Sequence, residues 1–194
     1  MTSIKNGKQL YHFTALGNLE SILKQGLLSR SQLEHFEDVA DPEILTDREK
    51  YKLDTMVPFH FFNSNPFDGR VCINNPDKKF VYIVIHRDTA KNNNWQIIPK
   101  HPLSGECELH TYVDGMNAID WKVMDQRDFK DPISKCICMA ECLSPNTVLP
   151  KDIFAIYTAN DHDAKFVQTL KAKYKLKFHV DLVPDRFPKV YKGR

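Results

Sequence analysis

The segment Phe80-Val-Tyr-Ile-Val-Ile-His86 constrains the fold more than any other part of the chain. Its first six residues are all apolar, so alternate positions do not divide into an apolar face and a polar face. A strand of this kind is buried on both sides. We therefore expect it near the centre of a sheet that other structure covers on each face. Strand candidates that supply its neighbours lie at 57–62, 95–98, 135–143, 153–157 and 176–182.

Helices are predicted between these strands, without the regular alternation of a parallel α/β fold. A short strand at Tyr11–Thr14 leads into a helix that Asn18 caps and Gly26 ends. An amphipathic helix is expected over 161–175. Because strands and helices mix without βαβ regularity, the pattern favours the α+β class. The chain of 194 residues is 42% hydrophobic and has no internal repeat, which indicates a single domain over 1–194.

Three polar segments complete the predicted architecture. Residues 31–52 are expected to be mostly helical, with capping boxes that begin at Ser31 and Thr46 and a break at Asp41-Pro42. Residues 63–70 have the composition of a loop. Residues 101–133 show no sustained period and are expected to be rich in loops. A long irregular segment inside a compact domain is uncommon unless it has a function.

The net charge of +2 conceals an asymmetry along the chain. Residues 165–194 carry nine Lys and Arg against two Asp, a charge of +7, which leaves −5 for residues 1–164. A basic end of this kind can follow a phosphate backbone and stack bases on aromatic rings. The alternative is a solvated helix face followed by an ordinary strand. The aromatic residues among these charges are Phe166, Tyr174, Phe178, Phe187 and Tyr191.

Several classes of protein are disfavoured by motifs that the sequence lacks. The five cysteines are irregularly spaced, include no CxxC pair, and are best explained as small buried residues, so we predict no metal. No GxxxxGK[ST] or GxGxxG motif supports a nucleoside triphosphatase or a Rossmann enzyme. No apolar run approaches the roughly 18 residues of a membrane span. We expect a cytoplasmic protein that does not bind a membrane.

Glu141 is the most informative polar residue, because it lies in the predicted core strand 135–143. A buried carboxylate is costly without a partner, so a cation or a positively charged ligand is expected nearby. A solvated glutamate at a strand end is the alternative. His12 and Thr14 share one face of the first strand, close to the helix start at Asn18. Such groups can hydrogen-bond an anionic or ribose-bearing ligand, although a histidine satisfied in the core is an equally good explanation.

The motifs that carry these residues resemble, in their order and spacing, the DarT family of NAD-dependent DNA ADP-ribosyltransferases. Each motif is short, and the similarity runs in patches over most of the chain. The matching segments are Tyr11-His-Phe-Thr14 with Asn18-Leu19, Ile44 to Arg48, Val57-Pro-Phe-His-Phe61, Asp120-Trp121, Asp131-Pro132 and Met139-Ala-Glu-Cys-Leu143.

The resemblance implies an ADP-ribosyltransferase-like fold: a split, mostly antiparallel β-sheet with an NAD cleft and flanking helices. It implies that Glu141 is the catalytic glutamate and that Arg48 steers NAD and the target base. His12 and Thr14 would hold the nicotinamide–ribose part of NAD, with Asn18 as a weaker contact. NAD would be a co-substrate, and no metal would be needed.

The resemblance also implies a place for the DNA substrate. Residues 101–133 occupy the position of the family's substrate-recognition loop, where Trp121 and Tyr112 would stack on a base. The family's turn after Phe61 carries an arginine that is displaced in this chain. Arg70 would either replace it or be a simple turn residue.

The implied function is a toxin that transfers ADP-ribose from NAD to a guanine or thymine of single-stranded DNA and releases nicotinamide. Its implied partner is an antitoxin with ADP-ribosyl hydrolase activity, of the macrodomain type or another. We expect a monomer. Transfer to RNA or protein is an alternative within the same fold. A non-catalytic nucleic-acid-binding domain that uses the basic C-terminal end is an alternative from another class.

Overall fold

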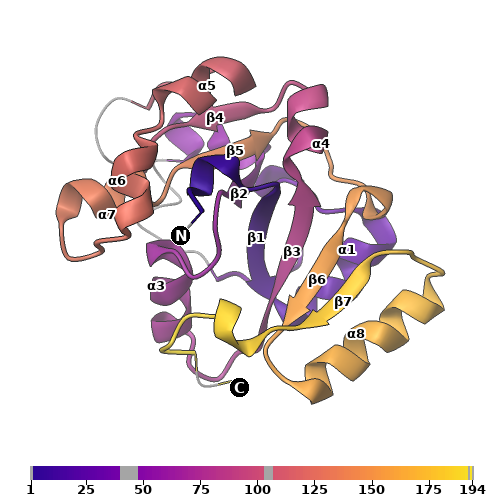
Figure 1. Cartoon of the computed structure of the whole chain (residues 1–194). Helices are drawn as coiled ribbons and strands as arrows, with labels where there is room; N and C mark the ends of the chain where they lie inside the picture. Colours follow the sequence, from indigo (N-terminus) through magenta and orange to yellow (C-terminus); the bar gives the residue numbers. More distant parts are fainter. Residues whose placement is uncertain (1, 40–47, 103–106, 192, 194) are drawn as a thin grey trace.

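A seven-stranded sheet organises the computed structural model, which describes residues 2–39, 48–102, 107–191 and 193 (Figure 1). Its strand order is β4-β5-β2-β1-β3-β6-β7, and all neighbours are antiparallel except β6 and β7. The mostly antiparallel sheet predicted from the sequence is therefore confirmed. The strands are β1 (Gln9–Ala15), β2 (Val57–His60), β3 (Phe80–His86), β4 (Gln96–Ile98), β5 (Glu141–Ser144), β6 (Ala155–Thr158) and β7 (His179–Leu182).

The predicted central strand is β3, with the bounds expected from the sequence. It pairs with β1 along its whole length and with β6 on its other side. Val81, Ile83 and Ile85 point into one hydrophobic core, while Phe80, Tyr82 and Val84 point into a second core on the opposite face. Burial on both faces explains why its sequence is continuously apolar.

Helices flank the sheet at both edges. Figure 1 shows α5, α6 and α7 grouped beside β4, whereas α8 lies along β6 and β7 at the other edge. The helices are α1 (Leu19–Gln25), α3 (Pro66–Asn74), α4 (Arg87–Asn92), α5 (Tyr112–Ala118), α6 (Trp121–Gln126), α7 (Pro132–Ile137) and α8 (Asp161–Lys173). Short 3-10 turns lie at Ile4–Asn6, Leu16–Asn18, Arg30–Gln32, Leu53–Thr55, Pro150–Asp152 and Pro184–Arg186.

Helix α1 ends at Gly26, as predicted. Gly26 has a φ of 95°, a backbone conformation that residues other than glycine rarely adopt. A Cβ atom at this position would lie 2.6 Å from Thr147, so the close approach of the two segments also requires glycine. Asn18 occupies the N-cap position of α1, but its side chain does not cap the helix.

The loop predicted over 63–70 is wrong, because α3 begins inside it. The Asn65 side chain accepts a hydrogen bond from the Asp68 backbone, and the Asp68 side chain accepts one from the Asn65 backbone. Pro66 occupies the first turn, where its missing N–H is not needed. This reciprocal cap uses Asn and Asp, so it was hidden among residues that usually indicate a turn. Arg70 is consequently an exposed helical residue and not a turn residue.

The strand predicted over 135–143 is also wrong in its first half. Pro132–Ile137 forms helix α7, which Asp131 caps through the Ser134 backbone. Strand β5 starts only at Glu141. Helices α5 and α6, and the first two residues of α7, likewise lie within the segment 101–133 that was expected to be rich in loops. The side chains of Thr111, Asp120 and Asp131 cap the N-termini of these helices with hydrogen bonds to the backbone. Helices this short show no amphipathic period in the sequence, so they were not predicted.

The polar segment 31–52 is less helical than predicted over its described residues. A capping box begins at Ser29 and closes with Gln32, instead of beginning at Ser31. Residues 33–39 contain no helix, and helical structure returns at residues 48–50. The features predicted at Thr46 and at Asp41-Pro42 lie outside the described residues.

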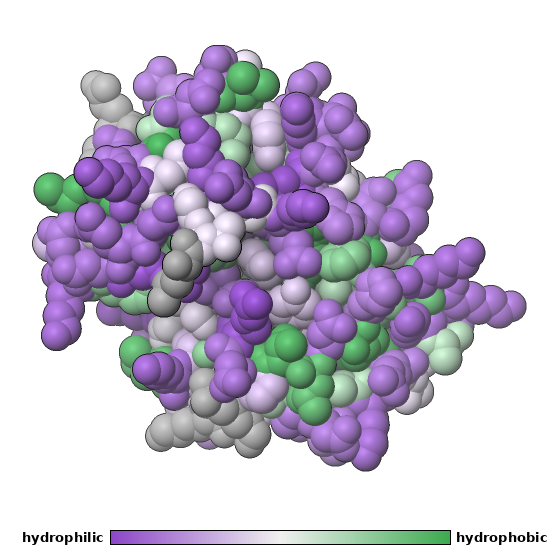
Figure 2. Space-filling model, viewed as in Figure 1, coloured by the Kyte–Doolittle hydropathy of each residue, from purple (hydrophilic) through white to green (hydrophobic). Residues whose placement is uncertain are grey.

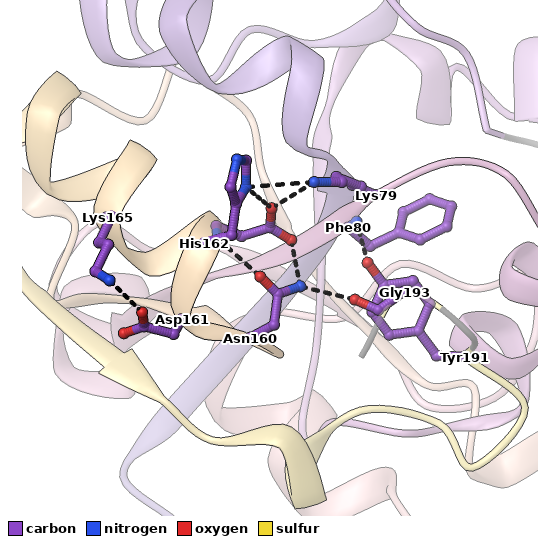
Figure 3. A network of polar contacts seen from close by, with 9 residues as sticks. Lys79, Phe80, Asn160, Asp161, His162, Lys165, Tyr191 and Gly193 are labelled. Atoms are coloured by element: carbon purple, nitrogen blue, oxygen red, sulfur yellow. Dashed lines mark hydrogen bonds and ion pairs between the residues drawn. The ribbon is translucent and has the colours of Figure 1, made fainter.

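The basic C-terminal end is bound to the sheet through its aromatic residues. Phe178, Phe187 and Tyr191 are at most 3% exposed, and the Tyr191 hydroxyl accepts a hydrogen bond from the Phe80 backbone. Asn160 donates to the Gly193 carbonyl nearby (Figure 3). Four strands separate β7 from β5, which places the two strands roughly 24 Å apart at the usual strand spacing. These three rings belong to the core and are not a base-stacking platform, whereas Phe166 on α8 is 42% exposed.

The cysteines are mostly buried, as predicted. Burial raises the pKa of Cys72 to about 12 and that of Cys138 to about 11, and it raises the pKa of Cys142 further. These thiols therefore stay protonated and act as small core residues.

Figure 2 shows a mostly hydrophilic face in the view of Figure 1, with apolar side chains in small separate groups. Within the described ranges, no helix has both the length and the apolar character to cross a membrane.

Asp68 generates a prediction about stability. It is fully buried, and its Oδ2 atom accepts from the Tyr82 hydroxyl at 2.7 Å and from the Asn65 backbone. Burial raises the pKa of Asp68 to about 7 from its ordinary 3.8. The folded protein therefore keeps a proton that the unfolded chain releases, so the free energy of unfolding should fall as pH rises through this window.

Asp68→Asn should remove this pH dependence, because an amide keeps the acceptor oxygen without a charge. Between pH 5 and 7.5 the wild-type protein should lose about 2 kcal/mol of unfolding free energy relative to the variant. Urea titrations across that pH range test the difference, with the exposed Asp77→Asn as the control. Parallel stability curves for wild type and Asp68→Asn contradict the prediction.

Candidate active site

A cleft opens in the sheet where β1 and β2 diverge. The two strands pair at Tyr11 and His60, and no other register pair joins them among the described residues. Beyond this point a cavity of about 440 Å³ lies between them. This opening matches the split in the sheet that the sequence predicted. It brings β1, β2 and the start of β5 to one site, together with Arg48 and the segment 27–39.

Arg48 and Glu141 form a buried ion pair in the wall of the cavity. The guanidinium Nη1 atom lies 2.8 Å from each carboxylate oxygen of Glu141. Glu141 is 7% exposed and Arg48 is 9% exposed. The partner expected for a buried carboxylate is therefore present. The pair joins positions that are 93 residues apart.

The ion pair determines the charge state of Glu141. Burial opposes ionisation, but attraction to Arg48 and the hydrogen bond from it outweigh burial and hold the pKa of Glu141 below its usual value. Glu141 is accordingly a carboxylate at neutral pH. The site therefore holds a fixed negative charge in a place from which most water is excluded.

His12 enters the cavity from β1 as a neutral ring. Its Nδ1 atom lies 2.8 Å from the Pro58 carbonyl oxygen, which only accepts, so Nδ1 carries the hydrogen. Burial lowers the pKa of His12 to about 4. The neutral ring therefore has an unprotonated Nε2 atom, which can accept a hydrogen bond from a ligand hydroxyl.

Thr14 and Asn18 lie further along the same wall. Asn18 bonds the backbone of Glu37 twice: its amide nitrogen donates to the carbonyl at 2.9 Å, and its oxygen accepts from the N–H at 2.7 Å. The amide nitrogen also lies 3.3 Å from the Thr14 hydroxyl. Asn18 thus fastens the segment 33–39 to the turn after β1, which explains why its side chain does not cap α1. All five predicted residues of the NAD site, His12, Thr14, Asn18, Arg48 and Glu141, line this cavity.

The three residues predicted to contact the base lie elsewhere. Trp121 is 8% exposed, its ring packs edge-on against Phe61, and its indole N–H donates to the Met116 carbonyl. Tyr112 belongs to the same hydrophobic core. Arg70 lies on the exposed surface of α3. None of the three lines the described cavity, and burial of the two rings favours a packing role over base stacking.

Sequence reasoning missed His60 and His101, which also line the cavity. His60 lies opposite Glu141 in the register of β2 and β5. The motif Val57-Pro-Phe-His60 predicted a strand but not the site role of His60. The contact of His60 with Ala140, just before β5, joins positions 80 residues apart in sequence. No signal along the chain identified the neighbour of His60.

The described residues contain no group of three or more metal-ligating side chains. The carboxylate of Glu141 is already engaged by Arg48 through both oxygens. Around this closed ion pair the cavity presents imidazole rings, the Thr14 hydroxyl and the Asn18 amide, and further charged side chains, among them Arg30 and Asp38, line it as well. Such a set suits a polar organic ligand with hydroxyl groups.

Comparisons with known proteins agree with this geometry. Residues 11–188 match the family model described as "ssDNA thymidine ADP-ribosyltransferase, DarT". A curated protein of Thermosipho africanus (strain H17ap60334), a "DNA ADP-ribosyl transferase-DNA ADP-ribosyl glycohydrolase fusion protein", is 30% identical over 170 residues. That alignment covers 80% of this chain and 43% of the relative, so the chain spans less than half of the relative's length.

Solved structures show the same fold at low identity. DarT of Thermus sp. 2.9 in complex with ADP-ribosylated ssDNA superposes with a TM-score of 0.81, at 17% identity, over 93% of this chain and 96% of that chain. The complex of the same protein with NAD+ gives a TM-score of 0.76 at 16% identity, over 94% and 98% of the two chains. Because the family model spans residues 11–188 of the chain, this protein belongs to the DarT family.

Proposed function

We propose that this protein transfers ADP-ribose from NAD+ to a base of single-stranded DNA and releases nicotinamide. The observation that carries the proposal is the buried carboxylate of Glu141, which Arg48 keeps ionised in the wall of the cleft. The family description names thymidine, so thymine is the first base to test and guanine is the second.

The cavity suits NAD+ in size and in polar groups. Its volume of about 440 Å³ falls within the usual range of small-molecule sites. We assign the ribose hydroxyls of the nicotinamide–ribose part to Nε2 of His12 and to the Thr14 hydroxyl, with Asn18 as a weaker contact. A neutral ring nitrogen accepts a hydrogen bond from a hydroxyl, whereas a protonated imidazole has only donors and loses that acceptor.

Glu141 acts on the carbon at which transfer occurs. When NAD+ is bound, it supplies a nicotinamide leaving group on an activated ribose carbon. As that bond breaks, positive charge develops at the carbon, and the fixed carboxylate of Glu141 stabilises it without reorganisation. Surroundings that exclude water strengthen this interaction.

Arg48 has two functions in this proposal. In the free protein it keeps Glu141 ionised and holds its carboxylate in place. The planar guanidinium also suits a phosphate better than a lysine would, so Arg48 can steer the pyrophosphate of NAD+ and the target base. Substitution by lysine retains the charge but loses the planar, multidentate geometry.

A single DNA strand is the appropriate acceptor for a site of this depth. Duplex DNA hides its bases, and a base must leave the stack before it reaches an enclosed site. The segment 101–133 remains our proposed substrate-recognition region, within a single domain over 1–194. Its start is fastened to α7, which precedes Glu141, by the hydrogen bond from the His101 N–H to the Cys136 carbonyl.

A cognate ADP-ribosyl glycohydrolase is the proposed partner. The curated relative carries such an activity in one chain with the transferase, according to its name. A macrodomain-type antitoxin that removes the modification would have the same effect in trans. We place the pair in the cytoplasm, where NAD+ and DNA occur together. Burial of Phe178, Phe187 and Tyr191 argues against the alternative of a non-catalytic domain that stacks bases on these rings.

Glu141→Gln should abolish transfer while it leaves NAD+ binding nearly unchanged. The amide cannot stabilise the developing charge, so the transfer rate should fall at least ~10³-fold. Arg48→Lys should reduce the rate by about tenfold to a hundredfold, because the planar contact is lost. Mass spectrometry of nucleosides after incubation with NAD+ measures both effects.

The assay should offer oligonucleotides that contain thymine or guanine, RNA, and a protein mixture as separate acceptors. Glu20→Gln, on the far side of α1 in an ion pair with Lys173, serves as the matched control. An ADP-ribose adduct on RNA or protein alone contradicts the DNA assignment. An adduct of unchanged yield in Glu141→Gln contradicts the catalytic role of Glu141.

NAD+ affinity should be independent of pH over most of the accessible range. Because the pKa of His12 is about 4, the ring should stay neutral until the pH falls below about 5 and should then lose its acceptor. His12→Asn keeps the bond to the Pro58 carbonyl but lacks Nε2, so NAD+ should bind about tenfold more weakly. Isothermal titration calorimetry from pH 5 to 9 checks both expectations. A decline in affinity centred near pH 6.5 indicates an exposed, ordinary histidine and contradicts this assignment.

A further inference from the structure

His60 is a cavity residue to which the function proposed above gives no task. It is 6% exposed and lies on β2 directly opposite Glu141 in the register with β5. Residues that face each other in this way have Cβ atoms about 5 Å apart on the same side of a sheet. The imidazole of His60 therefore lies beside the carboxylate on which the proposed reaction depends.

Hydrogen bonding determines which nitrogen of His60 carries its proton. The Nδ1 atom lies 3.1 Å from the Ala140 carbonyl oxygen, so Nδ1 is the donor. Burial lowers the pKa of His60 below its usual 6.5, although the negative charge of Glu141 acts in the opposite direction. The ring is therefore neutral at physiological pH, and Nε2 has a free lone pair.

Transfer to a nucleobase nitrogen requires a group that accepts a proton. Glu141 is poorly suited, because Nη1 of Arg48 contacts both of its oxygens and lowers its pKa. Its negative charge is also needed at the ribose carbon. A carboxylate that gained the proton early would lose the charge that stabilises the transition state.

His12 is a weaker base than His60 would be. Its pKa is about 4, and no carboxylate contributes to its environment: the charged groups that act on it are His60 and Arg48, both of which lower the pKa. His60 faces Glu141 from β5, Arg48 from the segment before β2, and His101. Only Glu141 among these raises the proton affinity of the ring and stabilises the imidazolium once it forms.

We propose that His60 is a further catalytic residue, which accepts the proton that the nucleobase loses during transfer. The inference rests on the proposed function. In the step, the nucleobase nitrogen forms a bond to the ribose carbon, and the bond from that carbon to the nicotinamide nitrogen breaks. The electron pair of the broken bond stays on nicotinamide. The N–H proton moves to Nε2 of His60, and the imidazolium then releases it to water.

Two substitutions separate this role from a structural one. His60→Asn places an amide nitrogen where Nδ1 donates to the Ala140 carbonyl but has nothing at the position of Nε2. His60→Gln reaches the position of Nε2 with an acceptor oxygen but loses the bond to Ala140. A purely structural histidine predicts the better activity for His60→Asn, whereas proton acceptance at Nε2 predicts that His60→Asn is severely impaired.

The experiment measures three quantities on wild type and both variants: melting temperature, NAD+ affinity by calorimetry, and the transfer rate to single-stranded oligonucleotides. We expect His60→Asn to keep its melting temperature and to bind NAD+ within threefold of wild type. Its transfer rate should fall about 10²-fold to 10³-fold, the usual contribution of general base catalysis. The wild-type rate should also decline in acid, at a pH below the ordinary pKa of histidine because burial lowers the pKa of His60, and this decline should be absent from His60→Asn.

Distinct outcomes overturn the inference and the proposed function. A His60→Asn variant that transfers within threefold of wild type removes the proton-accepting role. A parallel loss of NAD+ affinity in that variant assigns His60 to NAD+ binding and overturns the inference too. Absence of transfer by wild type to any nucleic acid, with NAD+ bound normally, removes the proposed function itself.

Discussion

The buried ion pair between Arg48 and Glu141 is the interaction on which the site depends. A carboxylate at this depth would take up a proton unless a cation stabilised its charge. Arg48 supplies that cation through one nitrogen shared between both carboxylate oxygens. The pair also links the first residue of β5 to the segment that precedes β2. Removal of either partner would leave an uncompensated buried charge, which destabilises the folded protein.

Three residues of the cleft divide the proposed chemistry between one carboxylate, Glu141, and two neutral acceptors, His12 and His60. His12 and His60 each donate from Nδ1 to a backbone carbonyl, at Pro58 and Ala140 respectively. These bonds set the tautomer of both rings, and burial keeps both neutral. In our proposals, the unprotonated Nε2 of His12 accepts a hydrogen bond from a ribose hydroxyl, and that of His60 accepts the proton of the nucleobase. Glu141 stays ionised and stabilises the positive charge at the ribose carbon.

The C-terminal end lies at the edge of the sheet formed by β6 and β7, where its aromatic residues and its lysines have different environments. Phe187 and Tyr191 pack together in the core that also holds Phe80 and Tyr82 of β3, and Phe178 enters the core on the opposite face of the sheet. The lysines remain at the surface, and several are paired, as Lys173 is with Glu20. A basic end with aromatic residues interleaved is therefore explained by ordinary packing of an edge strand and a helix, without a nucleic-acid partner.

The sequence alone determined the features that depend on local periodicity and on single-residue stereochemistry. The continuous apolar run predicted β3, the 3.6-residue period predicted α8, and Gly26 ended α1 where a positive φ was needed. Residue order also identified five of the residues that line the cleft, through their resemblance to a family. Helices α3 and α7 escaped prediction, because caps formed by Asn65 and Asp131 resemble turns in a linear reading.

Tertiary structure alone decided that Arg48 is buried against Glu141 and that His60 faces the same carboxylate. Those contacts join residues 80 or more positions apart, and only the folded sheet brings such positions within hydrogen-bond distance.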